Sequence, residues 1–469
     1  MADSIGVIIL AAGKGTRMKI PTPKALMPAL GKSLLDYVIE EGFLFAKQAK
    51  LPCEVGVVVG HLKEQLIEHL QMKFPHSPLK TAIQKEQNGT ADALKACFND
   101  HPHFWDHTYT LVACADTPLI QEADFSKLFL CLKNNPKLVG VAASFHLKRP
   151  TGYGRIIRSG NGFHIVEEKD ATDEEKKVTE VNSGFYILKT SHVKEVLSKI
   201  SNKNKSGEFY LTDMFQDNYA VESICFEDGT PFLGVNTMEQ LAEVTAELKG
   251  RHQQKLMVNG VRFLLPETTY IESSVEIAAG AVIYPNVTIL GKTKIAENVV
   301  IESGTFIKDS LIESNVHILA NSYIEESQIA SGASVGPMAR LRPGTEIGQK
   351  AKVGNFVEIK KSKLAAGAKV SHLSYVGDAE IGENSNIGCG FITCNYDGAN
   401  KHKTKIGSNT FVGSDTQMIA PVEIGDNVFI AAGSTISKSV PSDAFAIARA
   451  QQVTKEGMAK RFLKTKKSE

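Results

Sequence analysis

An aliphatic residue recurs at every sixth position through part of the second half of this chain. Isoleucines mark the successive positions from Ile271 to Ile307, with polar and small residues between them. Neither an α-helix nor a flat strand has a period of six. A six-residue repeat fits a left-handed parallel β-helix, in which each hexapeptide makes one short strand and one corner, and three complete a triangular coil. We therefore expect the isoleucines to point inward and stack.

The repeat continues with slips, and one interruption is long. The segment TCNYDGANKHKTK separates Ile392 from Ile406, where the spacing resumes. A stacked coil can serve as a rigid scaffold alone. A loop of this length inside an ordered array, however, is more often functional than accidental. We therefore expect the loop to take part in function.

Composition limits the function classes. The 469 residues suffice for two or three domains, and 53 basic against 52 acidic residues leave a net charge of +1. This balance argues against a general nucleic-acid binder. Seven cysteines without a CxxC pair argue against a disulfide framework or a zinc site. The apolar run GVIILAA is too short to span a bilayer, so we expect a cytoplasmic protein without membrane insertion.

The N-terminal sequence predicts a phosphate-binding turn. Residues 5–12 form a continuous apolar run that predicts a buried strand, and GKGTRM follows it directly. Two glycines allow a tight turn whose N–H groups can approach an anion, and Arg17 adds a positive charge. The dinucleotide pattern would need glycine at Met18 and the phosphate loop would need glycine at Leu26, so both are excluded.

Further motifs follow in a characteristic order. They are LAAGKGTRM, PTPKAL, AIQKEQNGTADA, ADTPL, PTGYGR, VEEKDAT, EVNSGFY, GEFYLTD and GVN, then RLRPG, VGNFVEIKK, SHLSYVGDAEIG, NIGCGFITCNYDGANKHKT, FVGSDTQ, IAAGSTI and AIARA. The first set resembles sugar-nucleotide pyrophosphorylases. Together the two sets resemble the bacterial bifunctional N-acetylglucosamine-1-phosphate uridylyltransferase and glucosamine-1-phosphate acetyltransferase. The resemblance implies an α/β Rossmann-like nucleotidyltransferase domain followed by an all-β left-handed parallel β-helix.

The domain organisation follows from these motifs and from one amphipathic segment. Leu241, Val244 and Leu248 predict a helix that ends near Gly250 or slightly later. We expect a pyrophosphorylase domain at 1–237, a linker helix at 238–259 and an acetyltransferase β-helix with a basic C-terminal tail at 260–469.

The resemblance implies a first active site for uridylyl transfer from UTP. Arg17 and Lys24 would neutralise charge during catalysis, and Asp116 and Asn236 would hold Mg²⁺, a hard cation that prefers oxygen ligands. Asp116 follows the predicted strand YTLVACA, although an aspartate before a proline can also be a simple turn residue. The implied UTP and UDP-sugar ligands are Leu10, Ala11, Ala12, Gly13, Lys24, Gln84, Gly89, Thr90, Cys114, Asp116, Gly154, Glu167, Asn182 and Asn236.

The resemblance also implies a second active site for acetyl transfer from acetyl-CoA. His372 is the candidate base because histidine titrates in the useful range, and Glu358 is the hypothetical acceptor for its other ring N–H. The implied sugar-phosphate ligands are Arg342, Lys360, Tyr375, Asn386 and Lys401. The implied acetyl-CoA ligands are Cys389, Asn395, Tyr396, Ser414, Ala432 and Arg449.

Some positions depart from the family pattern. Cys114 and Ala115 precede Asp116 where an aromatic residue and a glycine are usual, and Asp92 stands where a histidine is common. Cys389 and Phe391 replace smaller residues, which we expect to narrow the edge of the CoA channel.

The resemblance implies a homotrimer that makes UDP-N-acetylglucosamine for peptidoglycan and lipopolysaccharide. Glucosamine 1-phosphate is acetylated first, and its product then reacts with UTP to release pyrophosphate. Two alternatives remain at this stage. One is a monofunctional sugar-1-phosphate nucleotidyltransferase with a regulatory β-helix, and the other is a scaffold that binds nucleotide without turnover.

Overall fold

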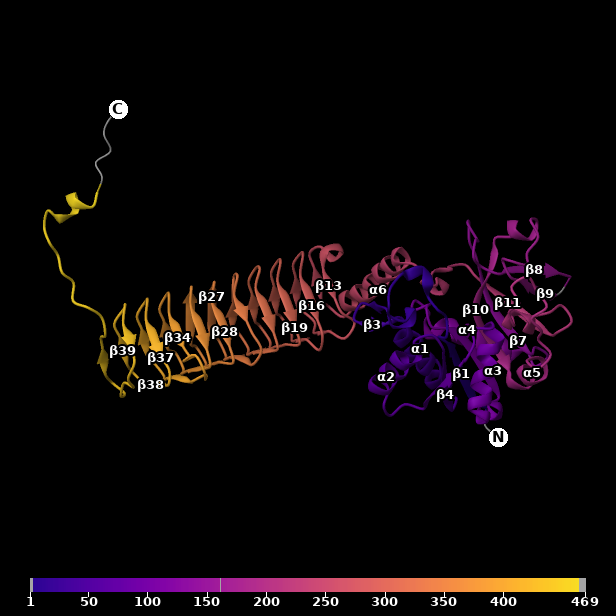
Figure 1. Ribbon diagram of the computed structural model, residues 1–469, viewed down its shortest axis with the longest axis horizontal. Coiled ribbons are helices and arrows are strands. Elements are labelled where there is room, and N and C mark those ends of the chain that lie inside the picture. Colours follow the sequence, from indigo (N-terminus) through magenta and orange to yellow (C-terminus); the bar gives the residue numbers. More distant parts are fainter. Residues whose placement is uncertain (1–2, 161, 464–469) are drawn as a thin grey trace, which may run out of the picture. The chain divides into compact units, whose positions relative to one another are not determined.

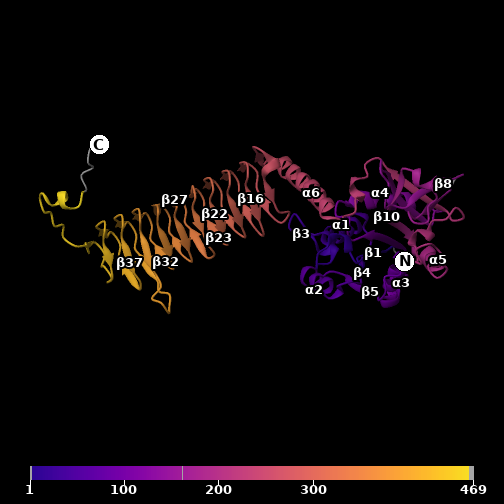
Figure 2. The same ribbon diagram turned by 45° about the horizontal axis from the view of Figure 1, so that its top comes forward.

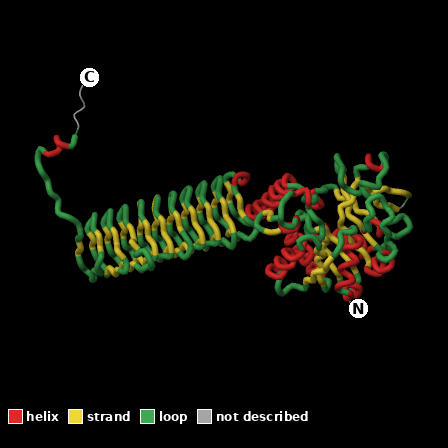
Figure 3. Tube along the Cα trace, in the orientation of Figure 1, coloured by secondary structure: helices red, strands yellow, loops and turns green. Residues whose placement is uncertain are grey.

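The computed structural model describes residues 3–160 and 162–463. The chain divides into two compact units, Met1–Gly250 and Arg251–Glu469. Helices other than short 3₁₀ turns belong to the first unit and to the segment that enters the second (Figure 3). Each unit has its own hydrophobic core, so each is described by itself.

The first unit is built on a mostly parallel sheet with the order β11-β7-β10-β6-β1-β4-β5. Strands β6, β1, β4 and β5 are parallel, whereas β10 runs antiparallel to β6 and β7. The strands are β1 (Ile5–Leu10), β2 (Pro28–Ala29), β3 (Lys32–Ser33), β4 (Cys53–Val59), β5 (Leu79–Ile83), β6 (Tyr109–Cys114), β7 (Gly140–His146), β8 (Arg155–Ser159), β9 (Gly162–Val166), β10 (Glu180–Lys189) and β11 (Val221–Phe226). The predicted strand at 5–12 therefore ends at Leu10, and the two alanines that follow belong to the turn.

Helices cover both faces of this sheet because alternate residues of each strand point to opposite sides. Ile5, Val7 and Ile9 pack into one core with helices α1, α2 and α4, whereas Ile8 packs into the other with α3 and α5. Burial on both faces explains why β1 is continuously apolar. The helices are α1 (Leu34–Ala49), α2 (Lys63–Lys73), α3 (Thr90–Asp100), α4 (Glu122–Asn134) and α5 (Thr190–Val196).

Helix α6 (Met238–Val258) connects the two units in sequence. It continues through Gly250 for eight further residues and ends one residue before the end of the linker helix expected at 238–259. Val244 and Leu248 are buried, as the amphipathic pattern predicts.

The second unit is a parallel β-helix of three sheets, visible as a regular stack of short strands (Figure 1). The first sheet contains β12 (Arg262–Phe263), β15 (Val282–Ile283), β18 (Val300–Ile301), β21 (His317–Ile318), β24 (Ser334–Val335), β27 (Lys352–Asn355), β30 (Lys369–His372), β33 (Asn386–Ile387), β36 (Phe411–Val412), β39 (Phe429–Ile430) and β41 (Phe445–Ala446). The second contains β13 (Tyr270–Ile271), β16 (Thr288–Leu290), β19 (Phe306–Lys308), β22 (Tyr323–Glu325), β25 (Arg340–Leu341), β28 (Glu358–Lys360), β31 (Tyr375–Gly377), β34 (Ile392–Cys394), β37 (Gln417–Ile419) and β40 (Thr435–Ile436). The third contains β14 (Glu276–Ile277), β17 (Lys294–Ile295), β20 (Leu311–Ile312), β23 (Ser327–Ile329), β26 (Thr345–Ile347), β29 (Lys363–Leu364), β32 (Ala379–Ile381), β35 (Thr404–Ile406) and β38 (Val422–Ile424).

The stacked isoleucines confirm the six-residue prediction. Ile271 pairs with Ile289 and Ile289 with Ile307, which places one full coil at eighteen residues. These side chains are fully buried in one continuous core that runs along the β-helix. Burying an isoleucine contributes about 1.5–3 kcal/mol, so the repeat itself supplies much of the stability of this unit.

The long interruption leaves the stack as a loop between β34 and β35, and it projects from the coils beneath β32 (Figure 2). Because of this insertion, Ile381 pairs with Ile406, twenty-five residues later. The inward position beside the loop is taken by Thr393, which is 1% exposed, whereas Ile392 is 42% exposed. A polar residue can occupy this inward position because the buried Thr393 hydroxyl is hydrogen-bonded to the backbone of Gly377.

The seven cysteines all lie in the described part of the chain and are free thiols. Among residues 3–160 and 162–463, no helix has the length and apolar character needed to cross a membrane.

Candidate active sites

The first site is a cavity of about 350 Å³ at the carboxyl ends of β1 and β6. Ligands of open parallel sheets bind at this end of the strands. Ten of the residues expected from the sequence line the cavity, namely Leu10, Ala11, Ala12, Gly13, Lys24, Gln84, Gly89, Thr90, Cys114 and Asp116. Gln87 and Glu208 also line it but were not assigned a role, although both lie inside motifs that the sequence analysis singled out.

Glycine is required at two turns of this cavity. Gly15 has φ +58, and a Cβ there would lie 3.0 Å from Cβ of Lys24, so the turn and the lysine approach closely. Gly89 has φ +117, and a Cβ there would lie 2.4 Å from the carbonyl oxygen of Phe209. The Thr90 hydroxyl accepts a hydrogen bond from the backbone N–H of Leu211 at 3.0 Å. The GEFYLTD segment therefore closes one wall of the cavity.

Two cationic side chains meet two oxygen-bearing side chains beside the cavity. Nζ of Lys24 contacts the Asp116 carboxylate and lies 3.1 Å from Oδ1 of Asn236. Nη2 of Arg17 donates to the same Asn236 oxygen at 2.8 Å. The backbone N–H of Val235 donates to the carbonyl of Asp116 at 2.8 Å, which holds the two segments together.

The side-chain oxygens of this cluster are the kind of ligand that a magnesium ion prefers. Asp116 and Asn236 come from different segments, yet their side-chain oxygens converge on one ammonium group, so the protein already directs two oxygens at one cation. Among the described residues, no cluster of three or more His, Cys, Asp or Glu side chains could hold a metal ion. Mg²⁺ bound through few protein ligands, together with substrate phosphates and water, is the usual mode in phosphate-transfer sites.

The three expected sugar ligands form a second cluster next to the cavity. The backbone N–H of Asn182 donates to the carbonyl of Gly154 at 2.9 Å, and a Cβ on Gly154 would lie 3.5 Å from Oε2 of Glu167. The Thr212 hydroxyl donates to Glu167 at 3.2 Å. Burial raises the pKa of the Glu167 carboxyl, with nearby Glu208 and Asp170 adding to the effect.

Three departures from the family pattern, Cys114, Ala115 and Asp92, lie at this first site. Cys114 lines the cavity, its thiol contacts the carbonyl of Gly184, and burial raises its pKa to about 12. The thiol is therefore a poor nucleophile at neutral pH. Asp92 accepts a hydrogen bond from Nε2 of Gln84 at 2.9 Å, and the carbonyl of Gly89 accepts another at 3.0 Å. Asp92 thus fixes the amide of an expected uracil ligand.

The second set of expected residues is distributed around the edges of the β-helix. We call the corner between the first and second sheets the first edge, and the corner between the second and third sheets the second edge. His372 ends β30 at the first edge. Three expected acetyl-CoA ligands, Cys389, Ser414 and Ala432, lie at the same edge in successive coils.

Backbone hydrogen bonds stack these first-edge residues in a row. The carbonyl of Cys389 accepts from Asp415 N at 2.7 Å, and the carbonyl of Ser414 accepts from Gly433 N at 2.8 Å. Nη1 of Arg449 then donates to the carbonyl of Ala432 at 2.7 Å. Cys389, Ser414, Ala432 and Arg449 therefore follow one line parallel to the β-helix axis. Asn386 lies on β33, the strand of the first sheet that precedes Cys389.

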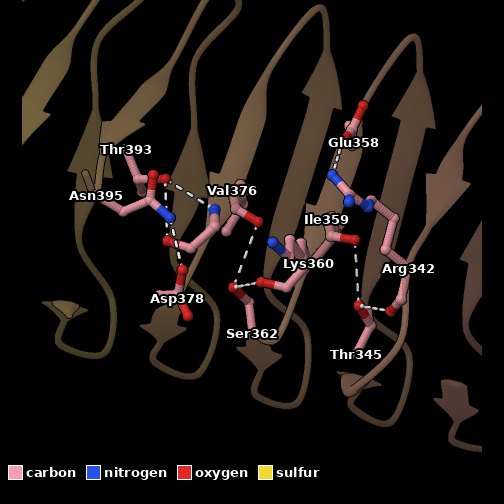
Figure 4. Close-up of polar contacts among 11 residues, drawn as sticks. Arg342, Thr345, Glu358, Ile359, Lys360, Ser362, Val376, Asp378, Thr393 and Asn395 are labelled. Carbon is pink, nitrogen blue, oxygen red and sulfur yellow. Dashed lines mark hydrogen bonds and ion pairs between the residues drawn. The ribbon is translucent and has the colours of Figure 1, made fainter. Parts of the chain in front are cut away.

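Lys360 ends β28 at the second edge, with Arg342 one coil earlier and Asp378 one coil later (Figure 4). The ammonium of Lys401 on the long loop lowers the pKa of Lys360, and Arg342 adds to this effect. Such mutual repulsion marks a place where an anion would be stabilised. Nδ2 of Asn395 donates to Oδ2 of Asp378 at 2.6 Å, which fixes the start of the loop.

The loop is ordered by its own contacts. Asp397 accepts hydrogen bonds from the backbone of Asn400 and Ala399 and from His402, and these bonds lower its pKa. Tyr396 is 60% exposed and pairs with Lys401 in an isolated bridge. The loop therefore presents Tyr396 and Lys401 as one unit.

Two expectations at the second site are wrong. Glu358 does not orient His372, because its carboxylate pairs with Nη1 of Arg342 at 2.9 Å, while Nδ1 of His372 lies 2.7 Å from Oδ1 of Asn355. Phe391 does not narrow a channel, because its side chain is fully buried in the β-helix core. The six-residue repeat could have predicted that the Phe391 side chain is buried. Phe391 lies at the first edge, two positions before Thr393, whose side chain points inward.

Tyr375 lies between the two edges, on the outer face of the second sheet. It pairs in register with Glu358 and with Ile392. A Cβ on Gly377 would lie 2.4 Å from the Tyr375 hydroxyl, so a glycine leaves room for this ring. The expected sugar-phosphate ligands thus extend from the first edge across the second sheet to the second edge.

Comparisons with known proteins cover both units. Residues 7–164 match the family model of the MobA-like NTP transferase domain. Residues 265–345 match the GMPPB C-terminal domain, and residues 403–438 match the bacterial transferase hexapeptide (six repeats). These models agree with an N-terminal nucleotidyltransferase and a left-handed hexapeptide β-helix.

Whole-chain relatives join the two halves. The chain is 44% identical over 476 residues to the bifunctional protein GlmU of Bdellovibrio bacteriovorus, with 99% of each protein covered. It is 40% identical over 461 residues to that of Geotalea uraniireducens and 41% identical over 461 residues to that of Shouchella clausii. In both cases 97% of this chain and 98% of the relative are covered. With both units matched in single relatives over nearly their full length, the chain belongs to the family of the bifunctional protein GlmU.

Proposed function

We propose that this chain makes UDP-N-acetylglucosamine in two reactions at two separate sites. The β-helix acetylates glucosamine 1-phosphate with acetyl-CoA, and the N-terminal unit transfers a uridylyl group from UTP to the product. The observation that carries the proposal is that one chain has two separate features. One is a cavity beside the cluster of Lys24, Asp116 and Asn236, and the other is a β-helix whose expected acetyl-CoA ligands are aligned along the first edge. Neither a monofunctional enzyme nor a scaffold accounts for both features.

In the uridylyl reaction, the phosphate of the sugar attacks the α-phosphorus of UTP and pyrophosphate leaves. The nucleophile is already anionic, so positioning and charge neutralisation suffice for catalysis. Arg17 and Lys24 supply positive charge where the turn meets the phosphates, and Gln84, Gly89 and Thr90 hold the base. Gly154, Glu167 and Asn182 hold the sugar. Mg²⁺ held by Asp116 and Asn236 would neutralise charge on the phosphates.

In the acetyl reaction, the amine of glucosamine 1-phosphate attacks the thioester carbon of acetyl-CoA. His372 accepts the amine proton as the new N–C bond forms, and the CoA sulfur leaves and is then protonated. Arg342, Lys360 and Lys401 bind the phosphate, while Tyr375 and Asn386 bind sugar hydroxyls. Cys389, Ser414, Ala432 and Arg449 line the CoA chain along the first edge. Asn395 and Tyr396 lie on the loop at the second edge and contact the CoA of a neighbouring copy.

A trimer supplies the walls that this second site needs. Ligand sites are concave, whereas the outer face of a β-helix is flat. The first sheet exposes the stacked rings of Phe411, Phe429 and Phe445, whereas the third sheet carries ion pairs such as Lys294 with Glu276 and Lys405 with Glu423. The first sheet therefore favours contact with neighbouring copies, and the third favours solvent. Free thiols and soluble nucleotide substrates support a cytoplasmic enzyme of cell-wall precursor synthesis.

The test uses two single variants of the full chain and two assays. Asp116→Ala should abolish UTP-dependent pyrophosphate release and leave thiol release from acetyl-CoA unchanged. His372→Ala should do the reverse. Loss of both activities in either variant, with the fold and oligomeric state intact, would refute the assignment of two separate sites.

A further inference from the structure

The candidate base has a side-chain partner that lies in the VGNFVEIKK motif but was assigned no role there. Nδ1 of His372 lies 2.7 Å from Oδ1 of Asn355, on the neighbouring strand of the first sheet. The two residues are in register at the ends of β27 and β30. This pairing extends the ladder two residues past the usual two-residue strand of the first sheet, because β27 and β30 each have four residues.

A glycine allows this close pairing. A Cβ on Gly354 would lie 1.9 Å from the carbonyl oxygen of Ser371, which is shorter than any real contact. The backbone carbonyl of Asn355 accepts from Leu373 N at 3.1 Å, and the Ser374 hydroxyl donates to the carbonyl of His372 at 2.7 Å. The backbones on both sides of the pair are therefore fixed, so the register of Asn355 and His372 is built into the coil.

We propose that Asn355 is a positioning residue that holds the His372 ring with its proton on Nδ1. The asparagine carbonyl oxygen accepts that proton's hydrogen bond, which leaves Nε2 unprotonated and directed away from the strand pair. Only an unprotonated nitrogen can take the amine proton, so the interaction selects the tautomer needed for acetyl transfer. The proposal rests on the assignment of His372 as the base.

The charged groups around the pair do not replace this interaction. Strand β27 carries one ionisable side chain, Lys352, which pairs with Lys369 at the opposite end of the two strands. Strand β33 carries none, and the thiol of Cys389 follows it at the first edge. Glu358, the carboxylate nearest along the second sheet, is engaged by Arg342. Tyr375 begins the next strand and faces outward. A neutral acceptor therefore orients this histidine, in contrast to sites in which a carboxylate does so.

The experiment compares isosteric variants of the full chain. Asn355→Leu removes the acceptor and should lower kcat for acetyl transfer about 10- to 100-fold, less than the loss in His372→Ala, with the KM values nearly unchanged. Asn355→Asp retains an acceptor and adds a negative charge. It should keep most of the activity and move the acidic limb of the kcat profile to higher pH by about one unit. In Asn355→Leu the acidic limb of the kcat profile should move to lower pH.

Controls separate the outcomes. Gln328→Leu makes the same kind of change on an outward position of the third sheet and should leave kcat and the pH profile as in the parent. Melting temperature and oligomeric state establish that each variant is folded. If His372→Ala is inactive while both Asn355 variants keep the parental rate and profile, the positioning role is wrong and the acetyl-transfer assignment stands. If His372→Ala remains active, the assignment of the base itself fails.

Discussion

Arg17 and Asn236 meet across 219 positions of sequence, with Nη2 of the arginine donating to Oδ1 of the asparagine at 2.8 Å. Lys24 reaches the same oxygen and also contacts Asp116. The ammonium of Lys24 therefore lies between the two oxygens proposed to hold Mg²⁺. Binding of a metal must compete with this ion pair, and the lysine becomes available to phosphate when it is displaced.

Replacing Lys24 tests this competition. Lys24→Met should lower kcat for uridylyl transfer about 100-fold, because a cation at the phosphates is lost. It should also lower the Mg²⁺ concentration that gives half-maximal rate, because Asp116 no longer has an internal partner. Metal titrations of the pyrophosphate-release rate measure both effects.

Lys47→Met is the matched control, since Lys47 is exposed on α1. Its rate and metal dependence should equal those of the parent. A Lys24→Met enzyme that needs more Mg²⁺ than the parent would contradict the competition.

The contact between Asp92 and Gln84 predicts an effect on nucleotide choice. Asp92 and the carbonyl of Gly89 take both hydrogen bonds of the Gln84 Nε2 group, so Oε1 is the atom left for the base. Asp92→Ala should let the amide rotate, raise KM for UTP about five- to tenfold and weaken discrimination against CTP. Values of kcat/KM for the two nucleotides measure this. Asp92→Asn keeps an acceptor and should stay near the parent, so equal losses in both variants would exclude an orienting role.

Burial of Glu167 predicts opposite effects on stability and on sugar binding. Its folded pKa is raised above the ordinary value of 4.5, so the ionised form is disfavoured in the folded state. This destabilisation is absent below the unfolded pKa and grows as pH rises through the folded pKa. Glu167→Gln should therefore raise the melting temperature of the first unit at pH 7 to 8, with little difference at pH 4. Because the carboxylate is a proposed sugar ligand, KM for N-acetylglucosamine 1-phosphate should rise.

Glu174→Gln is the control for this effect, because the Glu174 side chain is 82% exposed. Surface ion pairs contribute little, so its melting temperature should follow the parent at every pH. A melting temperature of Glu167→Gln at or below that of the parent at pH 8 would contradict the assigned cost of burial.

Periodicity predicted the β-helix because each inward position is repeated and selected for the same property. Ile271, Ile289 and Ile307 show this directly. At the first site the sequence pattern predicted only the buried strand and the glycine turn after it, and the other cavity residues were implied by the family resemblance. The partner of His372 was not, because Asn355 lies 17 residues away, one coil earlier, in a strand whose length depends on the close backbone approach at Gly354. Sequence spacing also does not show that the Glu358 carboxylate is already paired with Arg342, whereas the Asn355 side chain is available to His372.

The buried Thr393 shows how the coil tolerates a polar residue at an inward position. Its hydroxyl accepts from Gly377 N at 2.8 Å and lies 3.1 Å from the Gly377 carbonyl, so it replaces part of the ladder beside the loop. Thr393→Val keeps the shape but leaves the Gly377 N–H without this acceptor. The change should lower the free energy of unfolding of the β-helix by about 1–3 kcal/mol, despite the gain in apolar surface.

Denaturant unfolding of the full chain, followed by a probe in the β-helix, measures this loss. Thr393→Ser retains the hydroxyl and loses only a methyl group, so it should cost about 1 kcal/mol or less. The loop starts after β34, one residue beyond Thr393, and its Asn395 is held by Asp378. Thr393→Val should therefore also raise KM for acetyl-CoA, whereas Thr393→Ser should not. A valine variant as stable as the parent would show that packing, not the hydrogen bond to Gly377, determines the residue at this position.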